Sequence, residues 1–363
     1  MVKIITSSSD FSNLGLNSSQ KSLIVTKDAP SAIQIKNYFD DLRNVYLIEG
    51  MELLPYDFFS MAPNTRAKRI NSLSSFLKNK ESIVIASIST LLSPLPDPNH
   101  ITPLNSLAVG DAFDSDQIIE SLLQGGYTKE AFVALPGQFA VRGSVMDIFL
   151  TSNKDPIRIE HFGFQVESLR TFNAESQITN EKIEKLDLLP SYEFPINEKS
   201  SENFKREWRE NFEVFEEDSD IFSKIMSLKH AEGSEIYYPM FYGKKTSFLD
   251  YIKTIDQVYS QEGVYEAAAE FEALVQERYE EYRYDQRRPL LHPDKLYLRY
   301  HELEDYLRSS EKFDLETNTT SETEEKEETK RNEKADLSIN QIPNEGELVV
   351  HLSHGIGKFL GLK

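Results

Sequence analysis

The chain has 363 residues, of which 39% are hydrophobic and 28% charged, enough for two or three globular domains with cores of their own. Sixty acidic residues outnumber 40 lysines and arginines, and the formal charge of -20 argues against a surface whose main task is to grip a phosphate backbone. The absence of cysteine excludes disulfides, thiolate metal sites and cysteine nucleophiles. We find no signal-peptide core, lipidation signal or run of about 20 apolar residues, and therefore expect a soluble cytoplasmic protein.

The first 103 residues alternate short apolar runs with amphipathic segments. The runs at 23–25, 45–48 and 83–87 predict buried strands, and the segments between them predict helices, one capped by Ser31 and one over 66–77. Continuous apolar runs of this length are typical of parallel strands that are covered on both faces. Residues 1–103 are therefore predicted to form the first part of an α/β domain.

Residues 104–195 have a different pattern, with one helix over 115–123 followed by short strands around turns. A hairpin is expected from strands 157–162 and 166–172, joined through Gly163. Alternation places Arg158, Glu160 and Phe162 on one face of the first strand, and Ser168, Arg170 and Phe172 on one face of the second. Arginines beside aromatic side chains suit a protein-docking patch. A solvated sheet face with cross-strand ion pairs is an equal alternative.

The rest of the chain divides at a sharp change of composition. Residues 196–310 predict the second part of the α/β domain, with a solvated charged helix over 265–287, a helix over 301–307, and Trp208 as a core anchor. Residues 311–345 hold eleven acidic and five basic residues and few large apolar ones, so we expect a disordered linker. Order should resume at 346–363, which begins with a strand.

Motifs for catalysis are lacking. A phosphate-binding G-x-x-x-x-G-K-[ST] loop is absent, and the nearest matches are Gly-Ile-Gly-Lys at 355–358 and the glycine-free turn at 27–30. His351 and His354 form an H-x-x-H pair with no evident third ligand, which favours a structural role over zinc. We therefore expect no catalytic residue and no metal in this chain.

Several segments together resemble one family, the bacterial transcription-repair coupling factors, and specifically their N-terminal UvrB-like module. The resemblance covers about residues 20 to 310 in family order. Its motifs include Leu-Leu-Pro-Tyr-Asp at 53–57, Gly-Gln-Phe-Ala-Val-Arg-Gly at 137–143, Asp-Ile-Phe at 147–149, Arg-Ile-Glu-His-Phe-Gly at 158–163, Glu-Phe-Pro at 193–195 and Arg-Pro-Leu-Leu at 288–291. Residues 346–359 are similar to the start of the family's RNA-polymerase-interacting domain, a small β-barrel related to CarD-type polymerase binders.

The resemblance implies a degenerate RecA/UvrB-like α/β domain that has lost its phosphate loop. It implies that the inserted α+β segment is a UvrA-binding domain, followed by the disordered acidic linker. The residues carried over as candidate UvrA contacts are Arg158, Glu160, Phe162, Arg170 and Phe172, with Arg142 as a further candidate that could instead shape the turn at Gly143.

Intact members of that family release RNA polymerase stalled at damaged DNA with an ATP-dependent translocase, and recruit UvrA of nucleotide excision repair. ATP and magnesium serve the motor of the intact protein, so we expect no cofactor in this chain. The expected function is a non-catalytic adaptor, the N-terminal part of such a factor. The alternatives are a UvrB-type helicase subunit of the excision nuclease, which the missing phosphate loop disfavours, and a free-standing adaptor that ends at Lys363.

Overall fold

The computed structural model describes residues 3–13, 15–16, 19–39, 42, 44–213, 216 and 219–315, and the backbone of 348–351 and 355–358. The chain divides into two units, Met1–Leu315 and Glu316–Lys363. The second contains an antiparallel hairpin of β15 (Leu348–His351) and β16 (Gly355–Lys358), and β15 agrees with the strand predicted after residue 346. The predicted linker over 316–345 and the side chains of the H-x-x-H pair lie outside the described residues. Among the described helices, none is long and apolar enough to cross a membrane.

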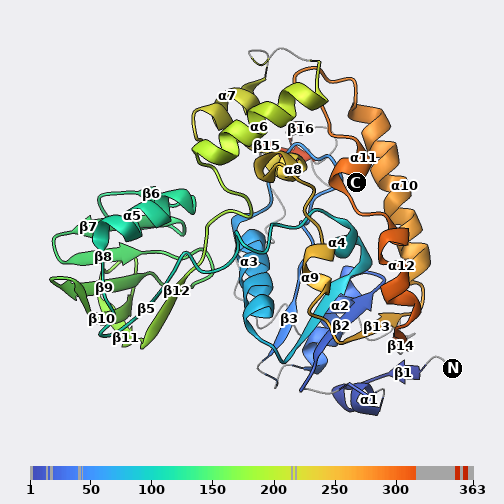
Figure 1. Ribbon diagram of the computed structural model, residues 1–363, viewed down its shortest axis with the longest axis horizontal. Coiled ribbons are helices and arrows are strands. Elements are labelled where there is room, and N and C mark those ends of the chain that lie inside the picture. Colours follow the sequence, from blue (N-terminus) through green and yellow to red (C-terminus); the bar gives the residue numbers. More distant parts are fainter. Residues whose placement is uncertain are drawn as a thin grey trace. The chain divides into compact units, whose positions relative to one another are not determined.

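The first unit is built on a six-stranded parallel sheet in the order β1-β14-β13-β2-β4-β3 (Figure 1). Its strands are β1 (Lys3–Ile5), β2 (Lys21–Thr26), β3 (Val45–Leu47), β4 (Ser82–Ser87), β13 (Gln257–Gln261) and β14 (Glu311–Leu315). Every residue of β2 and β4 is buried. Successive side chains enter opposite cores, with Leu23 and Val25 on one face and Ile24 on the other. This burial explains the continuous apolar runs in the sequence.

Helices cover both faces of the parallel sheet. Phe11 of α1 and Ile35 of α2 pack on the face of Ile24, whereas Ile70 of α3 and Ala268 of α10 pack on the other. The helices of this domain are α1 (Ser8–Asn13), α2 (Ala29–Tyr38), α3 (Pro63–Lys78), α4 (Ile88–Leu92), α10 (Val264–Tyr282) and α12 (Tyr300–Arg308). The predicted α/β class is confirmed.

Between β12 and β13, and again after α10, short helices enclose a core rich in aromatic side chains. Trp208 is fully buried there and packs against Phe204, Phe222 and Tyr237, so the predicted core anchor is confirmed. The elements are α6 (Glu198–Asn211), α7 (Asp220–Met226), the 3-10 helix η2 (Ser234–Tyr237), α8 (Tyr238–Tyr242) and α11 (Pro293–Leu296). The buried residues of α9 (Leu249–Ile252) belong instead to the core of the parallel sheet.

The inserted segment forms a second sheet, in the order β11-β10-β9-β8-β7-β6, and a separate antiparallel pair of β5 and β12 (Figure 1). Its elements are β5 (Asn105–Ala108), α5 (Ser115–Gln124), β6 (Thr128–Lys129), β7 (Gln138–Arg142), β8 (Val145–Ile148), β9 (Ile157–Phe162), β10 (Gln165–Phe172), β11 (Thr179–Lys182) and β12 (Lys185–Leu188). Ile118 and Leu122 of α5 share one core with Met146 and Ile159 of the sheet. The helix therefore covers one face of this sheet.

Buried polar contacts join the exit of the insert to the α/β domain. Arg69 of α3 and Glu193 are both fully buried, with 2.7 Å between Arg69 Nε and Glu193 Oε1. Tyr238 donates to the same carboxylate, from Oη to Oε2 at 2.7 Å. Arg66 donates from Nε to the Ser191 carbonyl at 2.9 Å. Removing one member of a buried ion pair leaves the other charge buried without a partner, which is strongly destabilising. These contacts therefore hold the end of the insert against the α/β domain.

Three predictions need correction, and one strand was missed. The linker does not begin at residue 311, because Glu311–Leu315 forms β14 and buries Phe313 between β1 and β13. Asp28 rather than Ser31 caps α2, since its carboxylate accepts from Ser31 N at 2.8 Å. The long charged helix ends at Tyr282, five residues earlier than predicted. Strand β1, which the sequence did not predict, pairs with β14 at the sheet edge.

Candidate functional site

The face of the inserted sheet opposite α5 carries an ordered row of charged side chains. Strand register aligns Asp147 of β8, Arg158 of β9, Arg170 of β10 and Lys182 of β11 side by side. A second row aligns Arg142, Val145, Glu160 and Ser168. We call the surface formed by Arg142, Asp147, Arg158, Glu160, Arg170 and Lys182 the basic face. Four cationic side chains against two carboxylates distinguish it from a chain that is strongly acidic as a whole.

Two similar turns set this register. Strands β7 and β8 are joined by Gly143 and Ser144, and β9 and β10 by Gly163 and Phe164, so each turn has two central residues. The glycines have φ of 62° and 58°. A glycine with positive φ in the first central position suits the turns that match the twist of a hairpin. The positive φ that this turn requires is supplied by Gly143 and not by Arg142.

Asp147 organises the arginines of the basic face. Its side chain is 1% exposed and accepts from Arg158, with 2.7 Å from Nε to Oδ1 and 3.0 Å from Nη2 to Oδ2. Arg142 Nη2 forms an ion pair with the same carboxylate. A carboxylate that receives a bidentate guanidinium holds it in one plane. The hydrogen bond to Asp147 also raises the pKa of Arg158 above its ordinary value.

Phe172 supports Arg158 from below rather than facing solvent. It is fully buried with Val133, Ala140 and Phe149, and the Arg158 guanidinium carbon lies 4.5 Å from its ring centroid. A residue that contacts UvrA directly needs an exposed side chain, and the ring of Phe172 is covered. Its place in the fold is that of a positioning residue, because it holds the arginine through packing and a cation–π contact.

The other candidates differ in what they present. Phe162 is 82% exposed at the end of β9, and Phe164 in the adjoining turn is 85% exposed. Glu160 is partly buried and accepts from Ser168 Oγ at 2.5 Å. Arg170 is partly buried, and its Nε has no hydrogen-bond acceptor among the residues that the structure describes. A buried donor without an acceptor costs about 1–3 kcal/mol, which a docking partner could relieve by reorienting the guanidinium.

The structure thus brings five of the six predicted residues together on one face and places Phe172 beneath it. Sequence reasoning missed Asp147 and Lys182. The signal for Asp147 was available, since a lone carboxylate inside the apolar run Val-Met-Asp-Ile-Phe at 145–149 must find a cationic partner when the strand is buried. Lys182 lies on a short strand that the sequence did not predict.

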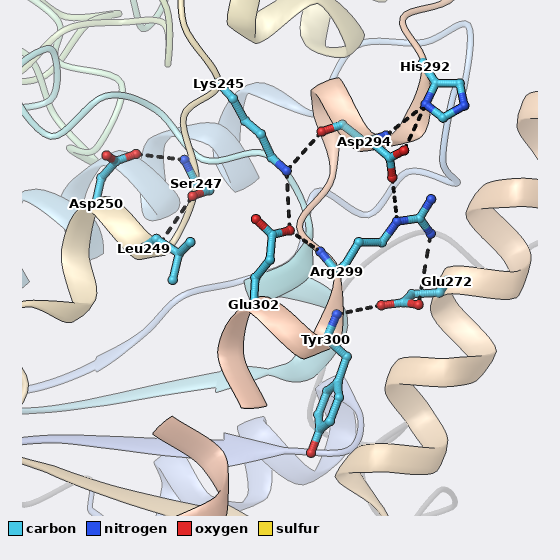
Figure 2. Close-up of polar contacts among 10 residues, drawn as sticks. All are labelled: Lys245, Ser247, Leu249, Asp250, Glu272, His292, Asp294, Arg299, Tyr300 and Glu302. Carbon is cyan, nitrogen blue, oxygen red and sulfur yellow. Dashed lines mark hydrogen bonds and ion pairs between the residues drawn. The ribbon is translucent and has the colours of Figure 1, made fainter. Parts of the chain in front are cut away.

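A second polar cluster joins three helices of the α/β domain, as Figure 2 shows. Arg299 donates from Nε to Asp294 Oδ1 at 2.8 Å, and this hydrogen bond lowers the pKa of Asp294. Glu302 accepts from the Arg299 backbone N at 2.8 Å, and Glu272 accepts from Tyr300 N at 2.6 Å. These side chains and backbone groups satisfy one another's hydrogen-bonding needs, and they hold the first turn of α12 in place. Within the part of the chain that the structure describes, no three His, Cys, Asp or Glu side chains are placed to hold a metal ion.

The turn after β2 is where a parallel sheet of this kind commonly binds phosphate, because the helix N-terminus attracts anions there. Here the turn holds Lys27 and Asp28, and the Asp28 carboxylate accepts from Ser31 N. The protein's own anion thus occupies the first turn of α2. The sequence lacks a phosphate loop, and in the structure a carboxylate lies where such a loop would bind phosphate.

Comparison with known proteins gives the family context. Residues 106–194 match the UvrB interaction domain family. The chain is 30% identical over 292 residues to a transcription-repair-coupling factor of Haemophilus influenzae, covering 79% of this chain and 25% of that protein. It is 27% identical over 300 residues to the transcription-repair-coupling factor of Escherichia coli, covering 81% of this chain and 26% of that protein.

Over about four fifths of its own length, the chain is therefore similar to transcription-repair-coupling factors. It spans about a quarter of the length of these relatives. The matched UvrB interaction domain contains all strands of the inserted sheet, from β6 to β11, and therefore the whole basic face. The recognised family and the site built from geometry coincide in the same segment.

Proposed function

We propose that this chain is an adaptor that binds UvrA of nucleotide excision repair through the basic face and the exposed ring of Phe162. The observation that carries the proposal is the position of this face inside the matched UvrB interaction domain. Its chemistry supports docking to a protein, because arginine and aromatic side chains are the residues that contribute most to binding energy.

The proposal extends to the intact transcription-repair-coupling factor. There, the adaptor recruits UvrA to RNA polymerase stalled at damaged DNA, and an ATP-dependent motor that uses magnesium releases the polymerase. Residues 346–363 would begin the polymerase-binding domain. The alternative of a UvrB-type helicase subunit is disfavoured by Asp28, whose carboxylate takes the position at α2 that a nucleotide phosphate would need.

The experiment measures the affinity of purified UvrA for the chain and for two variants. Phe162→Ala removes an 82% exposed ring, so folding stability should change by no more than about 0.5 kcal/mol. If the ring is an anchor, the dissociation constant should rise about tenfold or more. Arg142→Gln, at a side chain that is 45% exposed, should weaken binding by a smaller factor.

Leu123→Ala is the matched control. Leu123 is 50% exposed on α5, on the opposite side of the sheet, and its truncation should leave UvrA affinity unchanged. The proposal fails if Phe162→Ala and Arg142→Gln bind UvrA as tightly as the original chain, or if the control weakens binding equally.

A further inference from the structure

A pocket of about 440 Å³ lies at the carboxyl ends of β3 and β4, away from the inserted sheet. Its apolar floor and walls include Ala32, Leu47 and Ile48, with Tyr56 and Phe271 from more distant segments. The volume is within the roughly 300–1,000 Å³ of ligand pockets, and carboxyl ends of parallel strands are where open α/β sheets bind ligands. The pocket is therefore a candidate binding site.

The pocket wall formed by residues 48–57 and 59 is rigidly held. Tyr56 donates from Oη to the Leu291 carbonyl at 2.8 Å, and Arg278 donates from Nε to the Pro55 carbonyl at 2.6 Å. Glu52 and Tyr56 are held at φ of 57° and 58°, a left-handed conformation that is rare outside glycine. Such strain persists only where the surroundings impose it, and it concentrates at binding sites. The cavity is therefore preformed.

The mouth of the pocket is apolar and acidic. Ile33, Leu54 and Phe59 line it and are 52%, 52% and 64% exposed. Its ionisable lining residues are the carboxyl groups of Glu49, Glu52, Asp57 and Glu235 and the ammonium of Lys68. Glu235 is only 4% exposed and burial raises its pKa, so the negative charge at the mouth comes from the other three carboxylates.

The ammonium of Lys68 already pairs with Glu49 at 3.0 Å. Glu52 accepts from the Thr65 hydroxyl at 2.8 Å and makes no ion pair with any residue in the described part of the chain. The pocket thus carries net negative charge beside an exposed apolar surface. An anionic ligand such as a nucleotide phosphate would be repelled, whereas a cation with an apolar body would be complementary.

We propose that this pocket binds a basic and apolar peptide segment of a partner protein, in which a lysine or arginine stands beside an aromatic or aliphatic side chain. The apolar side chain would fill the cavity and the cation would face Glu52 and Asp57. A protein segment fits better than a small molecule, because Ile33, Leu54 and Phe59 line the pocket and are each more than half exposed, so the apolar surface continues into solvent. The proposal is independent of UvrA binding.

The test selects peptides from a random displayed library on the full chain, and measures the affinity of the best synthetic peptide. Enriched sequences should carry lysine or arginine next to a large apolar residue. Ala29→Trp places a ring at the exposed pocket edge and should weaken the peptide at least tenfold. Glu52→Gln keeps an acceptor for Thr65 but removes the charge, and should weaken it about threefold.

Asn37→Trp adds the same ring to an exposed position of α2 that does not line the pocket, so it should not change the affinity. A library that yields no binder, or whose binders are acidic or uncharged, overturns the proposal. Equal peptide affinity for the original chain and for Ala29→Trp also overturns it, since the peptide then binds elsewhere.

Discussion

Replacing Asp147 with asparagine should destabilise the basic face, because it removes the carboxylate that holds two of its arginines. Asparagine has nearly the same shape, but its amide group presents donors to two guanidinium groups that are themselves donors. The change therefore removes the negative charge and disrupts the bidentate contact with Arg158 and the ion pair with Arg142. It leaves the apolar residues around the site in place.

The magnitude follows from the exposure of each partner. Hydrogen bonds to charged groups contribute about 1.5–3 kcal/mol when buried. Arg158 is 17% exposed and can regain only some water, whereas Arg142 is 45% exposed and its pairing contributes about 0.5 kcal/mol. We therefore expect Asp147→Asn to reduce the local unfolding free energy by about 2–3 kcal/mol. The affinity for UvrA should fall as well, since Arg158 is no longer held over Phe172.

The assay is hydrogen exchange of peptides from β8 and β9, followed by mass spectrometry. Fluorescence of the single tryptophan would not report this change, because Trp208 lies in the helical core outside the insert. Ser168→Ala is the control on the same face. It removes the hydroxyl that donates to Glu160, and should cost no more than about 1 kcal/mol.

A double-mutant cycle with Arg158→Met isolates the pair. The coupling energy between the two substitutions should be about 2 kcal/mol, because each alone leaves the other partner unsatisfied. A coupling energy below about 0.5 kcal/mol, with protection of β8 and β9 unchanged in Asp147→Asn, would refute the assignment of Asp147 as the organiser of this face.

Two further predictions concern the junction between insert and α/β domain. Burial lowers the pKa of His100 to about 4 from its ordinary 6.5, so the unfolded chain takes up a proton first as pH falls, and stability should decline between about pH 6.5 and 4. His100→Gln, which can still donate to the Tyr192 carbonyl, should lessen that decline by up to about 3 kcal/mol in urea titrations. Arg69→Met should lower the unfolding free energy by about 3–5 kcal/mol, because the Glu193 carboxylate stays buried without its cation. Adding Glu193→Leu to this variant should recover part of the lost stability, although the Tyr238 hydroxyl then loses its acceptor. No recovery in the double variant would contradict the explanation that the loss comes from an unpaired buried charge.

Much of the fold could be predicted because its signals are local. Strands β2 and β4 are apolar throughout since both faces are covered, and β9 and β10 alternate around a glycine turn. Strands β1 and β14 escaped prediction because they are short and gain their burial from each other and from β13, which lies some 250 residues from β1. The polar composition around 311–315 concealed Phe313, which is fully buried.

The candidate site shows the same division. Alternation correctly placed Arg158, Glu160 and Phe162 on one face, since a strand allows only two directions for its side chains. It could not show that Val133 and Phe149 cover the end of that face and bury Phe172.

By itself, the sequence determined the α/β class, the inserted hairpin domain, the absent phosphate loop and the family resemblance, because each depends on residue types and their spacing. Only the tertiary structure decided which of the candidate residues face solvent. It also decided that Asp147 holds the arginines, and that residues 48–57, fastened at Pro55 by Arg278, line an acidic pocket. The physical reason is the same in each case: burial and charge pairing depend on which distant segments fold together, and no spacing along the chain specifies that.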